Sequence, residues 1–289
     1  MESQENQYRW PKAEAVYPDR PGRSYALKRL RYRLRAFSHR GLIAQFEQFI
    51  NQHPFLVKLL NEHADYSYPL VYRFLDKRFN RKQRFQAICD NLRFLPEKLT
   101  ALSTPIYKTP LSFGVVIPDF EMTLSMTTHQ PMEGYWVLEL WHKPRNELVY
   151  LPTFAKLGES LLISVVQGPN FEGSKEMVKQ LTKTCYGLRP AYLMVETMKA
   201  LTKALGFKTL LGIPQKYQNT SRFIQSSHYV VDYDAIFAES GGQLKDYWEL
   251  SLEIDRNLDD VPSKKRSMYR KRYAMLDDLA KVIEETLGL

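Results

Sequence analysis

Two polar stretches in the second half of the chain contain residue types that bind anions. The candidates for holding a phosphate or carboxylate group are Gln167, Gly168, Gly187, Leu188, Arg189 and Ala191. Arg189 directly precedes the predicted start of a helix, where a cation is unfavourable for the helix dipole unless an anion lies beside it. An ion pair between Arg189 and a nearby acidic side chain explains the residue equally well. Gln167 ends an apolar strand, where its amide could bind a ligand or satisfy backbone groups.

Three other side chains are candidates for proton transfer: Glu139, His142 and Tyr217. Glu139 interrupts an apolar strand, so it could be a general base with a raised pKa, or simply lie on an exposed face of the sheet. His142 ends the same strand and is the alternative base. The histidines and the two cysteines have no metal-ligand spacing, so we expect no metal site. The sequence contains no Walker loop and no Gly-x-Ser-x-Gly motif.

The elements that would position these residues form a strand–loop–helix–strand unit. The apolar run over 160–167 predicts a strand that is buried on both faces. Pro190 suits the first turn of a helix over 191–205, and Gly206 suits the left-handed position after its end. Residues 207–213 then return as a strand. Upstream, alternating apolar residues and turn-like separators predict an antiparallel meander over residues 111–117, 120–127, 135–142 and 148–154.

The first part of the chain has helical periodicity instead. After an irregular arm over residues 1–22, the pattern predicts helices that begin after Ser24 and run over 42–50, 55–60 and 66–93. Near the C-terminus we expect a strand over 247–254 and a helix after Pro262. We therefore predict an α+β fold, in which a mostly helical region over residues 1–103 precedes a mixed, mostly antiparallel sheet with flanking helices over residues 104–289.

Positive charge is concentrated near the start of the chain, which has a net charge of +9. No acidic residue occurs between Arg20 and Phe46. The helix after Ser24 carries two sets of residues, the cations Arg29, Arg31, Arg33 and Arg35 and the apolar stripe Leu27, Leu30, Leu34 and Phe37. We favour inward packing of the stripe, with attachment to an anionic membrane surface as the alternative. Nucleic acid is not an expected partner, because the aromatic residues that accompany the cations have the spacing of a helix core.

The compartment follows from three features of the sequence. The two cysteines, Cys89 and Cys185, provide no disulfide framework, and the N-terminus is polar and acidic, unlike a signal peptide. No apolar run approaches the roughly 20 residues that a membrane-spanning helix needs. We therefore expect a cytoplasmic protein, either free or peripheral on the inner membrane.

At Gln167-Gly168-Pro169 and Gly187-Leu188-Arg189-Pro190 the chain resembles the VirK/YbjX family of proteobacterial proteins. The resemblance covers roughly residues 25–255. It implies an association with virulence and with tolerance of envelope stress and antimicrobial peptides, but no established activity. The chain departs from the family after Gly212, where Ile213-Pro-Gln-Lys-Tyr217 replaces an expected polar, often histidine-containing stretch.

In the order of its elements, the chain is similar to the core of GNAT acyltransferases. Three antiparallel strands are followed by a glycine-bearing loop, a long helix and another strand. That resemblance implies a mixed sheet and a cofactor pyrophosphate held by backbone N–H groups, at positions 166–168 and 187–191 of this chain. It gives Glu139 the role of general base, and Tyr217, Tyr229 or Tyr233 the role of proton donor to a leaving thiolate. The usual GNAT phosphate loop is absent, and a predicted helix over 174–186 lies between the two candidate stretches.

Two functions of different classes fit these observations. The first is an acyltransferase that uses acyl-CoA or a similar donor and acylates an amine on an envelope component or a protein. The second is a non-catalytic accessory factor whose basic helices bind anionic lipid or a protein partner. Binding of acyl-CoA, compared with binding of anionic lipid, distinguishes the two.

Overall fold

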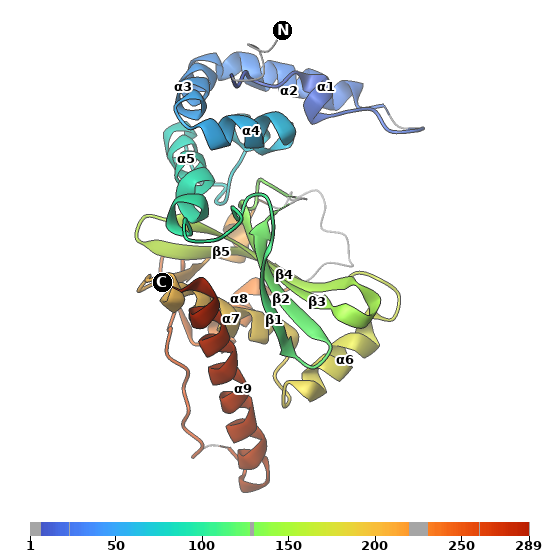
Figure 1. The fold of residues 1–289 in the computed structure, drawn as a ribbon, viewed down its shortest axis with the longest axis vertical. Coiled ribbons are helices and arrows are strands. Elements are labelled where there is room, and N and C mark those ends of the chain that lie inside the picture. The colour runs from blue at the N-terminus through green and yellow to red at the C-terminus, as the bar shows by residue number, and fades with distance from the viewer. Residues whose placement is uncertain (1–6, 23, 128–129, 220–230, 260, 289) are drawn as a thin grey trace.

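The computed structural model describes residues 7–22, 24–127, 130–219, 231–259 and 261–288. The N-terminal helices lie at one end of the molecule, and the sheet occupies the middle. The long helix α9 (Ser263–Leu287) runs from the opposite end back toward the sheet (Figure 1). Helices followed by a mostly antiparallel sheet confirm the predicted α+β fold.

The helical region contains α1 (Ala13–Val16), α2 (Ala26–Ser38), α3 (Arg40–Asn51), α4 (Pro54–Glu62), the 3-10 helix η1 (Ala64–Val71) and α5 (Arg81–Lys98). The prediction of an irregular arm over residues 1–22 was only partly right. Besides α1, this segment carries Tyr8, which is 1% exposed and whose hydroxyl is 2.7 Å from that of Ser67. The aromatic ring thus anchors the start of the chain in the core.

The continuous helix predicted over 66–93 is wrong, because the chain is not helical between Tyr72 and Asn80. Leu75 in this stretch has a φ of +55°, a left-handed conformation that an L-residue adopts at a cost. A new helix then needs a cap. The Asn80 side chain provides it by accepting hydrogen bonds from the backbone N–H groups of Lys82 and Gln83.

Within the described residues, eight strands form one sheet: β1 (Leu111–Ile117), β2 (Phe120–Met126), β3 (Trp136–His142), β4 (Glu147–Leu157), β5 (Ser160–Gln167), β6 (Leu210–Gly212), β7 (Gly242–Leu244) and β8 (Trp248–Leu250). Their order across the sheet is β1-β2-β3-β4-β5-β6-β8-β7. Only the pair of β5 and β6 is parallel among these strands. The first five strands lie where the periodicity predicts them, whereas β7 was not predicted and the strand expected over 247–254 is limited to β8.

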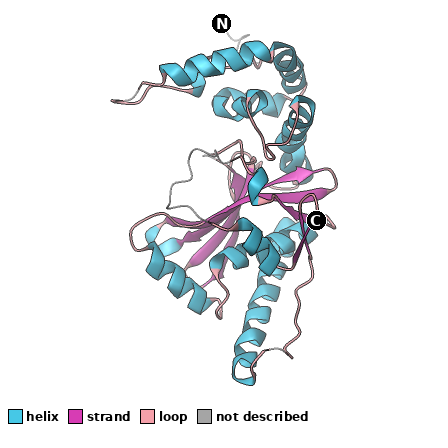
Figure 2. Ribbon diagram, turned by 180° about the vertical axis from the view of Figure 1, so that it is seen from behind, coloured by secondary structure: helices cyan, strands magenta, loops and turns pink. Residues whose placement is uncertain are grey.

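The remaining helical elements are α6 (Ser174–Thr184), α7 (Pro190–Ala204), α8 (Tyr233–Glu239) and the short 3-10 turns η2 (Lys143–Arg145) and η3 (Gln215–Tyr217). Helix α7 packs against β4, β5 and α9, while α5 contacts β4. Figure 2, the view from behind, shows helices lying against the sheet. The Asn91 carbonyl of α5 accepts a hydrogen bond of 2.9 Å from the Trp136 indole of β3. The helical region and the sheet therefore share one core, and a boundary at residue 103 stays a prediction.

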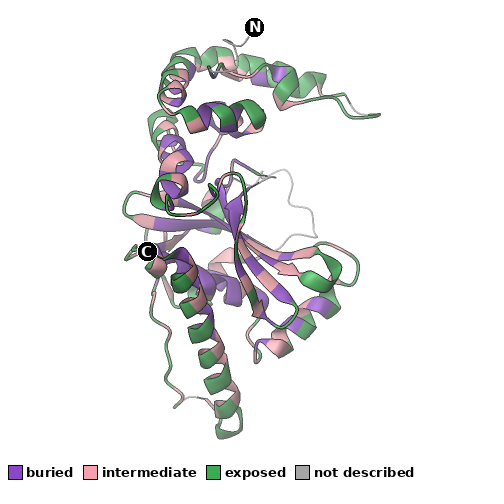
Figure 3. Cartoon of the chain, in the orientation of Figure 1, coloured by how far each residue is buried: buried purple, intermediate pink, exposed green. Residues whose placement is uncertain are grey.

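The apolar stripe of α2 does not pack inward as we expected. Leu27, Leu30, Leu34 and Phe37 are 60%, 51%, 61% and 70% exposed. The outer helices of this end of the molecule are accordingly mostly exposed in Figure 3. Tyr32, on the opposite side of α2, is the residue that the helix buries. The helix is thus attached by the side that carries Tyr32, and its apolar stripe faces outward.

Gly187 lies between two helices and adopts a positive φ of +77°. Its N–H donates to the Thr182 carbonyl at 2.8 Å, and an added Cβ would lie 3.3 Å from the guanidinium of Arg272. We expect Gly187→Ala to lower the free energy of unfolding by about 1–2 kcal/mol, because alanine is strained in this conformation. Urea denaturation measures the change. Gly41→Ala, in helix α3 with no neighbouring heavy atom within 4 Å of the added carbon, is the matched control and should be neutral or stabilising.

Candidate functional site

The parallel pairing between β5 and β6 stops halfway along β5. The last register pair joins Ile163 to Gly212, and the Ile213 N–H then donates to the Ile163 carbonyl at 3.0 Å. Strand β6 ends there, whereas β5 continues to Gln167. Among the described residues, the edge of β5 from Ser164 to Gln167 therefore has no strand on this side.

Two polar side chains occupy this open edge of β5. The Gln218 amide donates to the Ser164 carbonyl at 3.0 Å. The Tyr233 hydroxyl lies beside the backbone of Val166, which lowers the pKa of the phenol as a donating N–H does. Burial is the larger effect and raises the pKa of Tyr233 above its ordinary value. The backbone groups of this edge are thus satisfied by side chains, which a ligand can displace more easily than a strand.

Glu133 lies beside the same edge and is only 7% exposed. The Gln167 amide donates to its carboxylate at 3.1 Å, and the Gln130 amide can donate to both carboxylate oxygens, at 2.6 and 2.9 Å. Gly134 approaches β4 so closely that an added Cβ would lie 2.9 Å from the Phe154 carbonyl oxygen, so the residue after Glu133 packs against this strand. Burial raises the pKa of Glu133 to about 7, against the lowering effect of Gln167. This carboxyl group can therefore gain or lose a proton near neutral pH.

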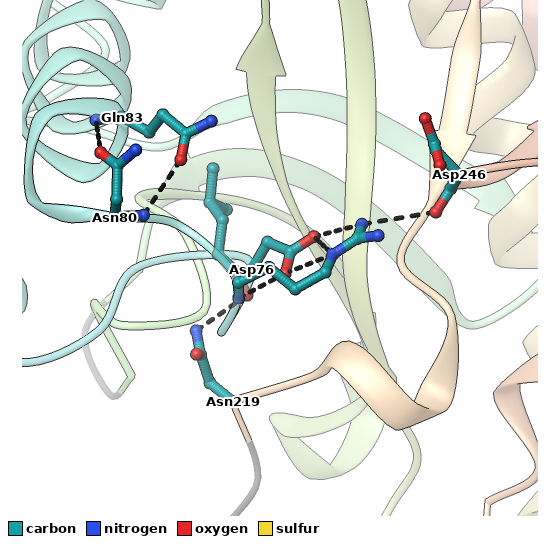
Figure 4. Close-up of polar contacts among 7 residues, drawn as sticks. Asp76, Asn80, Gln83, Asn219 and Asp246 are labelled. Carbon is teal, nitrogen blue, oxygen red and sulfur yellow. Dashed lines mark hydrogen bonds and ion pairs between the residues drawn. The ribbon is translucent and has the colours of Figure 1, made fainter.

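A second buried carboxylate lies in the non-helical stretch before α5 (Figure 4). The Asp76 side chain has an exposed fraction of 0% and accepts from Arg78 Nη2 at 2.6 Å and from Arg78 Nε at 3.0 Å. The Arg78 guanidinium lies 3.8 Å from the ring centre of Tyr217 and 4.9 Å from that of Tyr247. Asp246 receives a further hydrogen bond from Arg78 at its backbone carbonyl, 3.3 Å away. One guanidinium thus joins three distant segments of the chain.

Asn219 connects the residues around Glu133 with those around Asp76. The amide of Asn219 (Figure 4) donates to the Leu75 carbonyl at 2.8 Å and to the Met132 carbonyl at 2.9 Å, and Met132 directly precedes Glu133. The Leu75 N–H donates to the same Met132 carbonyl at 2.8 Å. We call Glu133, Gln167, Gln218 and Tyr233 the β5-edge site, and Asp76, Arg78, Tyr217 and Tyr247 the Asp76 cluster.

The structure gives the predicted proton-transfer residues different surroundings. Glu139 lies on β3, two strands from β5, and accepts hydrogen bonds from the Thr123 and Ser125 hydroxyls, each at 3.2 Å, and from the Trp141 indole at 3.3 Å. His142 ends β3, and its Nδ1 is buried with no hydrogen-bond partner in the part of the chain that the structure describes. Tyr217 belongs to the Asp76 cluster, and Tyr233 to the β5-edge site. Tyr229 lies outside the described residues.

The predicted anion-binding residues are divided between two places. Gln167 binds Glu133, whereas Arg189 forms an ion pair with Glu239 at 2.6 Å and a hydrogen bond with the Tyr192 hydroxyl at 2.7 Å. The Arg189 side chain is 63% exposed, so this pair contributes little stability. Arg189 could be explained by a bound anion or by an ion pair with an acidic side chain, and the structure contains the ion pair. Glu239, the partner in this pair, ends helix α8, and Tyr233 of the β5-edge site begins the same helix.

The other predicted anion-binding residues flank α6 and α7. Gly168 follows β5, and an added Cβ would lie 3.2 Å from the Tyr150 ring. Gly187 and Leu188 connect the two helices, and the Leu188 N–H donates to the Cys185 carbonyl at 3.0 Å. Ala191 is half-buried in the first turn of α7.

Sequence reasoning missed Glu133, Asp76 and Gln218. Glu133 and Asp76 are single carboxylates in short polar segments, which are usually exposed. The one available signal was the pairing of Glu133 with Gly134, because a glycine after a polar turn can indicate close approach of two backbones. No local pattern identifies Gln218, since its partner Ser164 lies far away in the sequence.

Other parts of the described chain offer weaker candidates for a site. Two adjoining hollows of about 730 and 740 Å³ lie at the opposite end of β5 and are open to solvent. The charged side chains that line them have mixed sign, so the buried carboxyl is the better indicator of chemistry. No group of three or more His, Cys, Asp or Glu residues within the described ranges could hold a metal ion. Nor does any described helix have the length and apolar character needed to cross a bilayer.

The fold and the β5-edge site define an α+β protein whose sheet opens beside a buried, titratable carboxyl group. The chain belongs to the family described as "Protein of unknown function (DUF535)", which matches residues 21–285. This family includes the VirK/YbjX proteins, so the resemblance in the sequence is confirmed. No solved structure matches the chain, and the likeness to GNAT acyltransferases therefore stays a prediction.

Three relatives illustrate the range of similarity. An uncharacterized protein of Haemophilus influenzae is 79% identical over 282 residues, which cover 98% of this chain and 97% of the relative. A protein of Mannheimia haemolytica named membrane protein LapB is 62% identical over 75% of this chain and 96% of its own length. The uncharacterized protein YbjX of Escherichia coli is 23% identical over 89% of this chain and 83% of its own. None of these names states a reaction.

Proposed function

We propose that the protein transfers an acyl group from a thioester such as acyl-CoA to an amine at the open edge of β5. The observation that carries this proposal is the end of β5–β6 pairing at Ile163, beside a buried carboxyl group with a pKa of about 7. Acyl transfer needs a donor for the thioester carbonyl, a base for the amine and an acid for the leaving thiolate. The donor is the backbone N–H of Val166, the base is the carboxylate of Glu133 and the acid is the phenol of Tyr233.

The proposed reaction proceeds by attack of the amine on the thioester. Glu133 removes a proton from the acceptor ammonium, and the amine nitrogen forms a bond to the carbonyl carbon. The Val166 N–H, released from Tyr233, stabilises the oxyanion. The C–S bond then breaks, Tyr233 gives its proton to the thiolate, and the second amine proton returns to the Tyr233 oxygen. A raised pKa keeps Tyr233 protonated until this step.

The part of the donor beyond its thioester is proposed to lie along helix α8. Tyr233 begins this helix and Glu239, the partner of Arg189, ends it. Seven helical residues extend over about 9 Å. A donor that lies along α8, with its thioester beside Tyr233, would therefore bring its phosphates toward Arg189. The guanidinium would exchange the Glu239 carboxylate for a phosphate, with which it forms strong charge-assisted hydrogen bonds.

The acceptor is proposed to be an amine at the cell envelope. The name of the Mannheimia haemolytica relative, membrane protein LapB, favours an acceptor at a membrane. A contribution to virulence and to tolerance of envelope stress, which the family resemblance implies, forms part of this proposal. The competing proposal is a non-catalytic accessory factor, which would have no affinity for thioesters.

Calorimetric titration with CoA and acetyl-CoA tests the proposal. We expect the parent protein to bind both, and Arg189→Ala to weaken binding by about 1.5–3 kcal/mol, the range for a charge-assisted hydrogen bond. The free energy of unfolding should change by less than about 1 kcal/mol, because the Arg189–Glu239 pair is exposed.

Arg256→Ala is the control, since Arg256 is also exposed and also pairs with one carboxylate, that of Asp277. This variant has the same loss of charge but should bind CoA like the parent. If the parent releases no heat with any CoA ester, the acyltransferase proposal fails and the accessory factor takes its place.

A further inference from the structure

Helix α2 exposes an apolar stripe to solvent. Its members Leu27, Leu30, Leu34 and Phe37 recur at spacings of three or four residues and so lie on one face of the helix. Their exposed fractions run from 51% to 70%. The other large hydrophobic residues of comparable exposure in the described chain are Val115 and Leu244, each isolated on a strand. Single exposed residues are common on protein surfaces, but a continuous stripe indicates a partner.

The orientation of α2 is fixed by its other face. Tyr32 is 2% exposed, donates a hydrogen bond of 2.8 Å to the Pro11 carbonyl and stacks on Trp10 at 6.1 Å between ring centres. Arg35 lies on the Tyr72 ring, 4.0 Å from its centre. These contacts occupy the side of the helix opposite the stripe. The stripe therefore faces outward in the folded protein, at the extreme end of the molecule (Figure 1).

Cations border the stripe on both sides. At 100° per residue, Arg31 falls on one flank of the stripe and Arg33 on the other. Both are exposed, although Arg33 also contacts Glu14. Arg29 and Arg35 are directed toward the protein, since Arg29 pairs with Asp19 at 2.8 Å and its side chain is 17% exposed. Of the four arginines expected to meet an anionic surface, Arg31 and Arg33 are thus the two that can reach it from the edges of the stripe.

We propose that α2 docks in the plane of an anionic lipid bilayer, with Leu27, Leu30, Leu34 and Phe37 inserted among the acyl chains and Arg31 and Arg33 at the headgroups. An apolar stripe between two cationic borders is the pattern of an interfacial helix. The absence of acidic residues from Arg20 to Phe46 adds attraction to anionic lipid. A second copy of the chain is a poorer occupant, because pairing two such faces would bring like charges together.

Vesicle sedimentation with the full chain tests this docking. We expect the parent to bind vesicles of equal parts phosphatidylethanolamine and phosphatidylglycerol and to bind phosphatidylcholine vesicles far less. Leu30→Gln with Leu34→Gln should weaken the partition by about tenfold or more. Val115→Gln with Leu244→Gln removes two equally exposed apolar side chains elsewhere and should have no effect.

A second pair of variants tests the charges. Arg31→Gln with Arg33→Gln should weaken binding to the anionic vesicles by about tenfold and reduce its dependence on salt. Lys179→Gln with Lys281→Gln lowers the net charge equally on other, exposed helix faces and should leave binding unchanged. The proposal is overturned if Leu30→Gln with Leu34→Gln sediments with anionic vesicles as the parent does. It is also overturned if the parent does not bind anionic vesicles. A parent dimer that this variant converts to monomer, without vesicle binding, identifies a second copy as the occupant instead.

Discussion

The contribution of Glu133 to the free energy of unfolding should fall by about 3 kcal/mol as the pH rises from the ordinary carboxyl pKa of 4.5 to beyond about 7. The folded protein holds the Glu133 proton more tightly than the unfolded chain, because burial disfavours the carboxylate. The stabilisation is therefore complete below 4.5 and is lost as the pH passes through about 7. Urea denaturation of the parent and of Glu133→Gln over a pH series gives this contribution by difference.

In Glu133→Gln this part of the pH dependence should be absent, because the amide does not titrate. Glu285→Gln, which removes an exposed carboxylate of α9, should keep the dependence of the parent. If Glu133 is the base of the proposed acyl transfer, kcat/KM should also fall by about 10²–10⁴-fold in the glutamine variant. A folded Glu133→Gln protein with the acyl-transfer rate of its parent would exclude Glu133 as the base.

Asp76→Asn should lower the free energy of unfolding by about 2–4 kcal/mol. The Asp76 carboxylate is inaccessible to solvent and accepts hydrogen bonds from the Arg78 side chain and from the Arg78 backbone N–H, the latter at 2.8 Å. An asparagine of the same size leaves the guanidinium without its countercharge and brings an amide N–H₂ group against donors. Equilibrium unfolding in urea measures the loss.

Asp277→Asn is the matched control for this substitution. Asp277 also pairs with one arginine, Arg256, but its side chain is 52% exposed. The control should therefore cost less than about 1 kcal/mol, because water screens the pair. Equal losses in the two variants would contradict a special role for burial at Asp76. A small loss at Asp76 would mean that the Asp76 cluster does not hold the three segments together.

Elements with a strong internal period could be predicted from the sequence. The strands β1 to β5 and the helices α3 and α7 each place apolar residues at regular intervals, and their ends carry proline, glycine or polar turns. The positive φ of Gly187 was predictable for the same reason, since two adjacent helices require a residue that can reverse the chain. Local chemistry decides such features, so a short window of sequence is enough.

The β5-edge site depends on distant contacts and could not be predicted in this way. Gln167 was identified as a ligand-binding candidate, but its partner Glu133 lies in a turn that sequence alone would place in water. The stripe of α2 shows the opposite error. Helical periodicity predicts which residues share a face, but the packing of Tyr32 determines whether that face points inward or outward.

The Asp76 cluster also has a consequence for the order of events during protein synthesis. The hydrogen bond from Arg78 to Asp246 joins residues 168 positions apart, and that from Asn219 to Leu75 joins residues 144 positions apart. A ribosome releases the N-terminal helices and the meander long before these partners exist, and they can fold through contacts that are closer in the chain. The cluster forms only when nearly the whole polypeptide has emerged. The three segments that Arg78 joins therefore stay unconnected in a growing chain until its synthesis is almost complete.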